Sequence, residues 1–242
     1  MLKHLFNGKL CDLRQMSIEN NLRDIERRVG EACERSGREI SEVKTMAVSK
    51  KHPPKMIEEA ANLGLELFGE NRIQESKVKI PLCPTGLEWH FIGHLQSNKA
   101  KDAVRLFHMI QGVDSRTLAH EIEKQAEKLT KQIPILIEVN IAGEASKFGY
   151  PPEKVLDEIS ELCHLSRVEV HGFMGMAPIS SNPERTRPIF RKLNDLRKKC
   201  EDKVGIPFPV LSMGMSQDFE VAIEEGATIV RLGTLLFGKR PT

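Results

Sequence analysis

The stretch Val43-Lys44-Thr45-Met46-Ala47-Val48-Ser49-Lys50-Lys51-His52-Pro53-Pro54 decides the fold class. Its first six residues form a short apolar, β-branched run, which is typical of a buried strand. An open doubly wound α/β sheet most often carries a glycine-rich phosphate loop directly after its first strand. The residues after Val48 include no glycine, so this stretch favours a closed parallel barrel over the open sheet.

Seven more runs of this kind follow, and charged amphipathic stretches separate them. The predicted strands are Val43–Val48, Leu65–Phe68, Leu87–Ile92, Phe107–Val113, Ile133–Ile141, Val168–Met174, Pro209–Met213 and Thr228–Leu232. The predicted helices lie near 53–63, 71–80, 97–105, 116–131, 151–164, 183–201 and 216–225. Alternating strands and helices imply a parallel sheet, and eight such units close naturally into a single (β/α)8 TIM barrel.

An extra helix is predicted before the barrel, over residues 17–36. Its apolar residues recur at steps of three and four, and Ser17 and Gly37 are suitable start and stop residues. Asn182 before Pro183 predicts another helix start, and Ser216 is predicted to cap the helix that ends at Gly226. No linker or internal repeat interrupts the chain, so we expect one domain over 1–242, with the barrel at about 43–240.

The bulk composition excludes several classes of protein. The chain has 242 residues, 29% of them charged, and a net charge of only +2, which does not suggest a nucleic-acid partner. The segment 1–8 is too polar for a signal peptide, and no apolar run is long enough to cross a membrane. The five cysteines, Cys11, Cys33, Cys83, Cys163 and Cys200, are widely spaced and odd in number. They predict reduced thiols and a cytoplasmic location.

Candidate functional residues lie where the predicted strands end, because barrels of this kind carry their sites there. Lys50 ends the first strand, and a lysine that loses solvent at a barrel mouth becomes a nucleophile. Ser212, Ser216, Gly233 and Thr234 follow the last two strands, where barrels often bind phosphate. A surface lysine and ordinary tight turns would explain the same residues, so spacing alone leaves both interpretations open.

No metal site is predicted. His90 and His94 have the spacing H-x3-H, but they lie on a strand and its following loop and do not share a helical face.

Several blocks of residues carry a family resemblance. They are Met46–Lys50, Phe68–Glu75, Trp89–Lys99, Ser146–Gly149, Gly172–Met176, Leu211–Ser216 and Val230–Gly238. In this order, over roughly residues 17–240, they resemble the YggS/PROSC family of proteins that bind pyridoxal 5′-phosphate (PLP). That family is similar to the barrel domain of alanine racemase and lacks the second, β-rich domain of that enzyme.

The resemblance implies seven cofactor-binding residues. Lys50 matches the lysine that forms a Schiff base with PLP, and Arg231 matches the arginine that faces the pyridine nitrogen. The other matches are the phosphate positions Ser212, Gly233 and Thr234 and the ring-pocket positions Asn71 and Met213.

The implied function is intracellular PLP homeostasis without established catalysis. An arginine only donates hydrogen bonds, so Arg231 would leave the ring nitrogen unprotonated and the cofactor a weak electron sink. Racemisation also needs two bases on opposite faces of the substrate. Lys50 is one, and Tyr150, the only tyrosine, is a weak candidate for the other, because a packed tyrosine is more common.

Two alternatives stay open: a weak PLP-dependent amino-acid racemase, and a barrel enzyme that acts on a phosphorylated metabolite without PLP. For the favoured function, apo PLP-dependent enzymes are candidate partners. We expect a monomer, because the domain that supports dimerisation in the racemases is missing.

Overall fold

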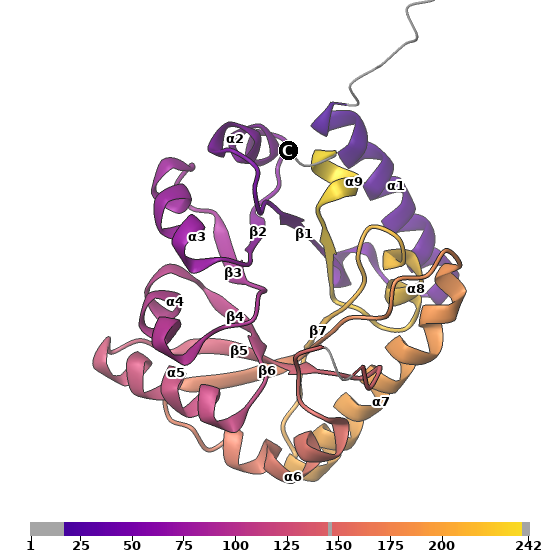
Figure 1. Cartoon of the computed structure of the whole chain (residues 1–242). Coiled ribbons are helices and arrows are strands. Elements are labelled where there is room, and N and C mark those ends of the chain that lie inside the picture. Colours follow the sequence, from indigo (N-terminus) through magenta and orange to yellow (C-terminus); the bar gives the residue numbers. More distant parts are fainter. Residues whose placement is uncertain (1–16, 145–146, 239–242) are drawn as a thin grey trace, which may run out of the picture.

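The computed structural model describes residues 17–144 and 147–238. Eight parallel strands form a closed barrel in which each strand pairs with the next along the chain and β8 pairs with β1 (Figure 1). The strands are β1 (Lys44–Val48), β2 (Leu67–Glu70), β3 (Glu88–Phe91), β4 (Met109–Val113), β5 (Ile133–Val139), β6 (Val168–Gly175), β7 (Val210–Ser212) and β8 (Ile229–Leu232). The predicted barrel is therefore confirmed.

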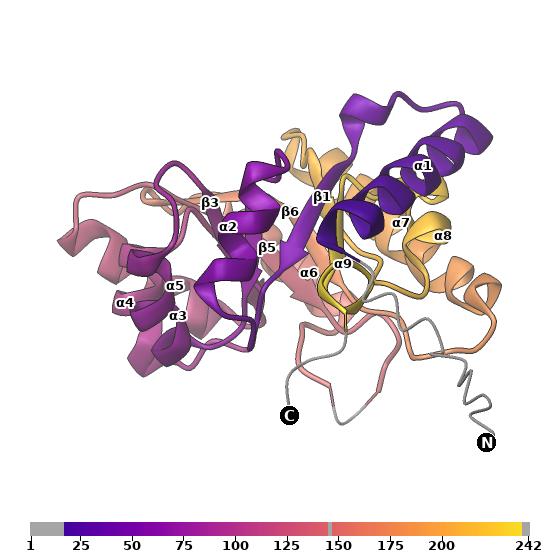
Figure 2. The same cartoon turned by 90° about the horizontal axis from the view of Figure 1, so that it is seen from above.

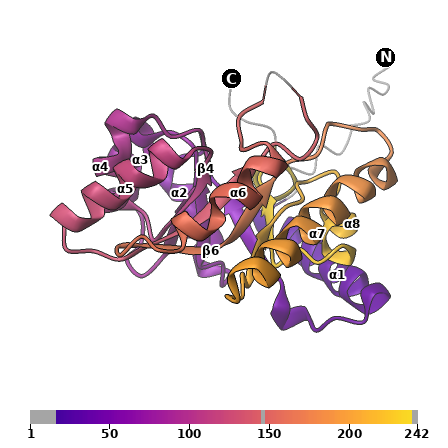
Figure 3. The same ribbon diagram turned by 90° about the horizontal axis from the view of Figure 1, so that it is seen from below.

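Helices surround the barrel, with α3, α4 and α5 on one side and α1, α7 and α8 on the other (Figures 1 and 3). They are α1 (Ile18–Ser36), α2 (Pro54–Asn62), α3 (Ile73–Lys79), α4 (Ala100–Leu106), α5 (Arg116–Lys128), α6 (Pro152–Leu162), α7 (Arg187–Val204), α8 (Phe219–Glu224) and α9 (Thr234–Phe237). Short 3-10 helices cover Ile40–Glu42, Ile80–Leu82, Ser97–Lys99 and Pro183–Thr186.

The strand residues divide into two sets because side chains alternate across a sheet. One set, which includes Phe68, Trp89 and Phe173, joins the large hydrophobic core between the strands and the helices. The alternate set fills the barrel itself with two smaller apolar clusters, one around Met46 and one around Leu136. The interior is thus a packed core with a few buried polar side chains, among them His90, Gln111 and Arg231.

Two of the three predicted helix starts are confirmed. The Ser17 hydroxyl accepts the Asn20 N–H at 3.2 Å, and the Asn182 side chain accepts the Glu184 N–H at 3.1 Å. The prediction that Ser216 caps the following helix is wrong. α8 begins only at Phe219, and the Ser216 hydroxyl instead accepts the Leu235 N–H at 3.3 Å.

The amino-terminal helix α1 lies against α8 and α9 (Figure 2). Buried Asn21 donates a 2.8 Å hydrogen bond from its amide to the Leu236 carbonyl in α9. Arg28 pairs with Glu220 of α8 at 2.8 Å. α1 therefore supports the two helices that follow β7 and β8.

Within the described residues, no helix has the length and apolar character that a membrane span requires. Cys33, Cys83, Cys163 and Cys200 form no disulfide. Cys11, the segment 1–8 and Ser146 lie outside the part of the chain that the structure describes.

Candidate functional site

A cavity of about 480 Å³ lies at the carboxyl ends of the strands. Its walls come from the carboxyl-terminal parts of β1, β6 and β8 and from residues that follow β1, β3, β6, β7 and β8. The lining residues are Val48, Lys50, Ile92, Met174, Met176, Ala177, Ile179, Ser180, Met215, Ser216, Gln217, Asp218, Arg231, Gly233, Thr234 and Leu235. One lysine, one buried arginine, several hydroxyl groups and an apolar wall thus share one cavity.

Lys50 sits in a turn that a buried ionic network holds. The hydroxyl of Ser49 donates to the Glu70 carboxylate at 2.7 Å. The Lys79 ammonium, which is also buried, donates to Glu70 at 2.9 Å and to the Ser49 carbonyl at 3.0 Å. Lys51 then has a φ of 65°, a left-handed conformation that non-glycine residues adopt rarely. The hydrogen bonds of Ser49 therefore fix the turn on the side that precedes Lys50.

Arg231 is 5% exposed and forms the floor of the cavity. Its guanidinium donates to the Ser212 carbonyl and hydroxyl at 2.7 and 2.8 Å and to the Gly175 carbonyl at 2.9 Å. Burial lowers the pKa of Arg231 to about 10, and the charges of Glu138 and Asp218 oppose this shift. Arg231 thus stays protonated at neutral pH.

The segment after β8 approaches the end of β1 closely. A Cβ atom at Gly233 would lie 3.3 Å from the Val48 carbonyl oxygen, so glycine brings the backbone into the cavity with little room for a side chain. Thr234 and Leu235 continue the wall, and Ser216 reaches it from the β7 side. Backbone and hydroxyl groups of this kind suit a phosphate.

Four of the seven predicted site residues meet in this cavity: Lys50, Arg231, Gly233 and Thr234. The structure does not bring the side chains of Asn71, Ser212 and Met213 into its wall. Met213 is fully buried in the core outside the barrel, and Ser212 lies beneath Arg231 as its hydrogen-bond partner. Asn71 is half-buried, and its carbonyl oxygen would lie 2.5 Å from a Cβ atom on Gly93.

Glu138 was missed in the sequence. It is 4% exposed on β5, and its Oε2 atom has no hydrogen-bond partner among the described residues. Burial, together with the nearby charge of Asp114, raises the pKa of Glu138 to about 7. A lone carboxyl residue in the apolar run Ile133–Val139 was the available signal, because an unpaired acid is rarely buried.

Tyr150 does not face the cavity. It is 2% exposed, and its hydroxyl donates to the Glu158 carboxylate at 3.1 Å. Burial and the charge of Glu158 raise the pKa of Tyr150 above its ordinary value. The structure therefore gives no support to Tyr150 as a second base.

The two histidines of the H-x3-H spacing diverge. His90 points into the barrel and bonds Glu88 at 2.8 Å, whereas His94 lies on the mouth loop and bonds Asp114 at 2.9 Å. No cluster of metal-ligating side chains occurs in residues 17–144 and 147–238.

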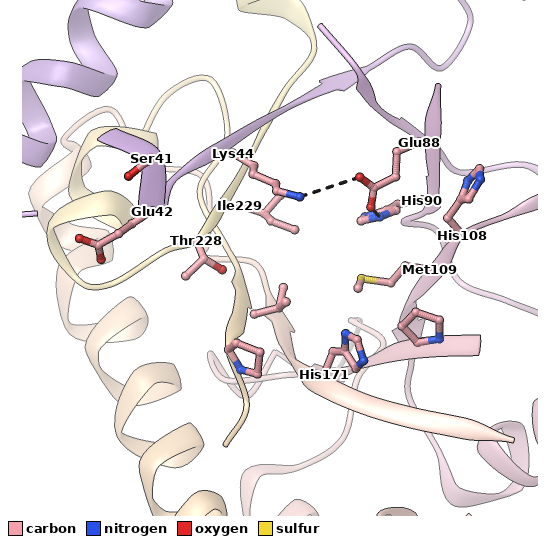
Figure 4. A pocket seen from close by; sticks show the side chains of 13 residues that line it. Ser41, Glu42, Lys44, Glu88, His90, His108, Met109, His171, Thr228 and Ile229 are labelled. Atoms are coloured by element: carbon pink, nitrogen blue, oxygen red, sulfur yellow. Dashed lines mark hydrogen bonds and ion pairs between the residues drawn. The ribbon is translucent and has the colours of Figure 1, made fainter. Parts of the chain in front are cut away.

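A second cavity, of about 560 Å³, lies at the opposite end of the barrel, where the strands begin. Figure 4 shows Lys44, Glu88 and His90 pointing toward one another there, with His108 and His171 nearby. None of the predicted site residues lines this amino-terminal cavity.

Comparisons with known proteins agree with this geometry. Residues 17–241 match the family model described as alanine racemase, N-terminal domain. The chain is 48% identical to the pyridoxal phosphate homeostasis protein of Aquifex aeolicus, over 88% of this chain and 94% of that protein. It is 38% identical to the protein of the same name from Schizosaccharomyces pombe, over 81% and 84% of the two chains.

Among solved structures, PipY of Synechococcus elongatus PCC7942 with PLP bound superposes with a TM-score of 0.80 at 34% identity. The match covers 92% of this chain and 100% of PipY. The barrel, the position of its cavity and these matches together show that the chain belongs to the pyridoxal phosphate homeostasis protein family, whose fold is the alanine racemase N-terminal domain.

Proposed function

We propose that this protein binds PLP through a Schiff base on Lys50 and serves PLP homeostasis in the cytoplasm, without turnover of amino acids. The observation that carries the proposal is the position of Lys50 in the same cavity as the buried guanidinium of Arg231. The PLP-bound structure of PipY supports the choice of ligand.

The residues in the cavity fit the three polar parts of PLP. The amine of Lys50 would bond the aldehyde carbon, and Arg231 would supply N–H donors for the ring nitrogen. Ser216, Gly233 and Thr234, which line the same cavity, would hold the phosphate. These three replace the predicted set Ser212, Gly233 and Thr234, because the Ser212 hydroxyl already bonds Arg231.

The chemistry of the same residues favours a protein that binds and releases the cofactor over one that uses it for catalysis. Bound PLP supplies an electron sink, and the sink is strong only when the ring nitrogen is protonated. The Arg231 guanidinium only donates hydrogen bonds. A ring nitrogen that accepts a bond from it therefore stays unprotonated and neutral. The tyrosine considered as a second base points away from the cavity and bonds Glu158. We further propose that the protein is a monomer and that apo PLP-dependent enzymes receive the cofactor from it.

The test is the visible spectrum of the purified protein, followed by borohydride reduction and mapping of the labelled peptide. We expect a yellow protein whose reduced adduct is on Lys50. Lys50→Ala should be colourless, whereas Lys51→Ala, which removes the neighbouring exposed amine, should keep the band. A protein that stays colourless with added PLP would contradict the proposal and favour a phosphorylated metabolite as the ligand.

Exchange of the substrate Cα hydrogen with deuterated solvent distinguishes a protein that only binds PLP from a racemase. We expect no exchange above that of free PLP for amino acids mixed with the loaded protein. Exchange that depends on Lys50 would show that the protein is a racemase-type enzyme.

A further inference from the structure

A continuous chain of hydrogen bonds runs through the barrel from the Lys50 cavity to the amino-terminal cavity. Its members, in order, are Arg231, Ser212, Gln111, His90 and Glu88, joined at 2.8, 2.7, 2.9 and 2.8 Å. β4 and β7 are not neighbours in the sheet, so the bond between Gln111 and Ser212 crosses the interior. The four members from Arg231 to His90 are each no more than 5% exposed.

The two ends of the chain together set the direction of its bonds, because a guanidinium only donates and a carboxylate only accepts. A guanidinium only donates, so the Ser212 oxygen accepts from Arg231, and its own hydrogen donates to the Gln111 carbonyl oxygen. The Gln111 amide then donates to Nδ1 of His90. His90 must therefore carry its proton on Nε2, which donates to the Glu88 carboxylate.

The surroundings of His90 agree with this neutral tautomer. Burial lowers the pKa of His90, and the charges of Lys44 and His108 act in the same direction. The hydrogen bond and charge of Glu88 oppose the shift. The hydrogen bond from His90 in turn lowers the pKa of Glu88, so the end of the chain is a carboxylate at neutral pH.

We propose that Gln111 and His90 are positioning residues for Arg231, which hold its guanidinium in the orientation that meets the ring of PLP. The contacts with Ser212 and Gly175 use three of the five guanidinium N–H groups, which leaves two for the cavity. If Gln111 stops accepting from Ser212, the Ser212 hydroxyl is free to rotate, and the guanidinium loses a fixed partner. This inference rests on the proposed PLP site.

Packing alone does not explain a polar chain at this place. Replacing a buried polar network with apolar side chains of similar volume is often neutral or stabilising. The rest of the interior is filled by residues such as Met46, Met109 and Leu136. If the chain had a purely structural role, Gln111→Met would lower stability, because Ser212 and His90 would each lose a partner, but it would leave the Kd for PLP unchanged.

The first test compares Gln111→Met with Met109→Leu by titration of each apo-protein with PLP. Both change one interior side chain of β4 by a similar volume, but only the first breaks the chain. We expect the Kd for PLP to rise roughly tenfold in Gln111→Met, as if a displaced guanidinium lost about one hydrogen bond to the ligand, and less than twofold in Met109→Leu. Equal Kd values in Gln111→Met and the wild type would overturn the inference.

The second test needs no cofactor. The nitrogen chemical shifts of His90 in the apo-protein report its tautomer directly. We expect Nε2–H in the wild type and a change of tautomer or mixture in Gln111→Met, whereas Met109→Leu should match the wild type. A wild-type His90 that is protonated on Nδ1 would refute the direction of the chain. A wild-type protein that binds no PLP would instead refute the proposed function itself, and this inference with it.

Discussion

Glu138 is a carboxyl group inside the barrel, close enough to Arg231 for their charges to interact. Its pKa rises from 4.5 to about 7 on folding, so the native state holds a proton that the unfolded chain has lost between these values. The free energy of unfolding should therefore fall as the pH rises from about 4.5 to 7. We expect Glu138→Gln to be more stable than the wild-type apo-protein at pH 8, by up to about 3 kcal/mol, with a smaller difference near pH 5.

Urea denaturation at several pH values measures this effect. Glu66→Gln is the matched control, because Glu66 is an exposed residue of the same type near the start of β2. It should leave the pH profile unchanged. A Glu138→Gln profile parallel to that of the wild type would mean that Glu138 does not titrate in this range.

The sequence predicted several residues of the cavity wall, but it did not predict the buried residues that form hydrogen bonds with them. Lys50, Arg231 and Gly233 follow from short blocks of consecutive residues, each recognisable by itself. The partner of Ser212 is Gln111, which is 101 residues away and on a strand that is not its neighbour in the sheet. Such a pair depends on how the barrel closes and fills, which no local pattern specifies.

At the scale of the elements, α1 supports the cavity from outside the barrel. The Asn21 amide is the partner of the Leu236 carbonyl in α9, two residues beyond Thr234 of the cavity wall. Asn21→Ala leaves that buried carbonyl without its donor, which costs about 1–3 kcal/mol. We expect denaturation to show a loss of this size and the Kd for PLP to rise, because α9 loses its support.

Asn20→Ala provides the control for this helix. Asn20 is the same residue type at the preceding position, but its side chain is exposed. Alanine there should be neutral or slightly stabilising, since it favours the helix. Equal losses of unfolding free energy in the two variants would show that the Asn21 bond to α9 contributes nothing to stability.

The elements themselves were predictable, because strand and helix periods alternate clearly along the chain. All eight strands lie within two residues of their predicted bounds. The capping role of Ser216 was not predictable in the same way. The helix starts only at Phe219, three residues beyond Ser216, and the Ser216 hydroxyl accepts the Leu235 N–H from the next βα unit instead.

At the scale of the whole molecule, the cavity spans the place where the barrel closes. β7 has only three residues, and the Arg231 side chain adds bonds from β8 to Ser212 on β7 and to Gly175 on β6. Lys50 follows β1, the other neighbour of β8. A ligand that contacts Lys50, Ser216 and Thr234 would therefore join the ends of three adjacent strands.

Binding at this closure should stabilise the entire fold. At a PLP concentration of about 100 times Kd, mass action adds about 2.7 kcal/mol to the free energy of unfolding, which corresponds to a rise in Tm of roughly 5–10 °C. Hydrogen exchange should slow most in β7 and β8 and least in β5, which supplies no residue to the cavity wall.

Lys50→Ala separates stabilisation by PLP in the cavity from stabilisation by PLP that forms imines with surface lysines. The variant keeps the exposed lysine amines and loses only the amine in the cavity. It should show a much smaller rise in Tm at the same PLP concentration. If it is stabilised as strongly as the wild type, or if β5 gains as much protection as β8, then PLP does not act at the closure of the barrel.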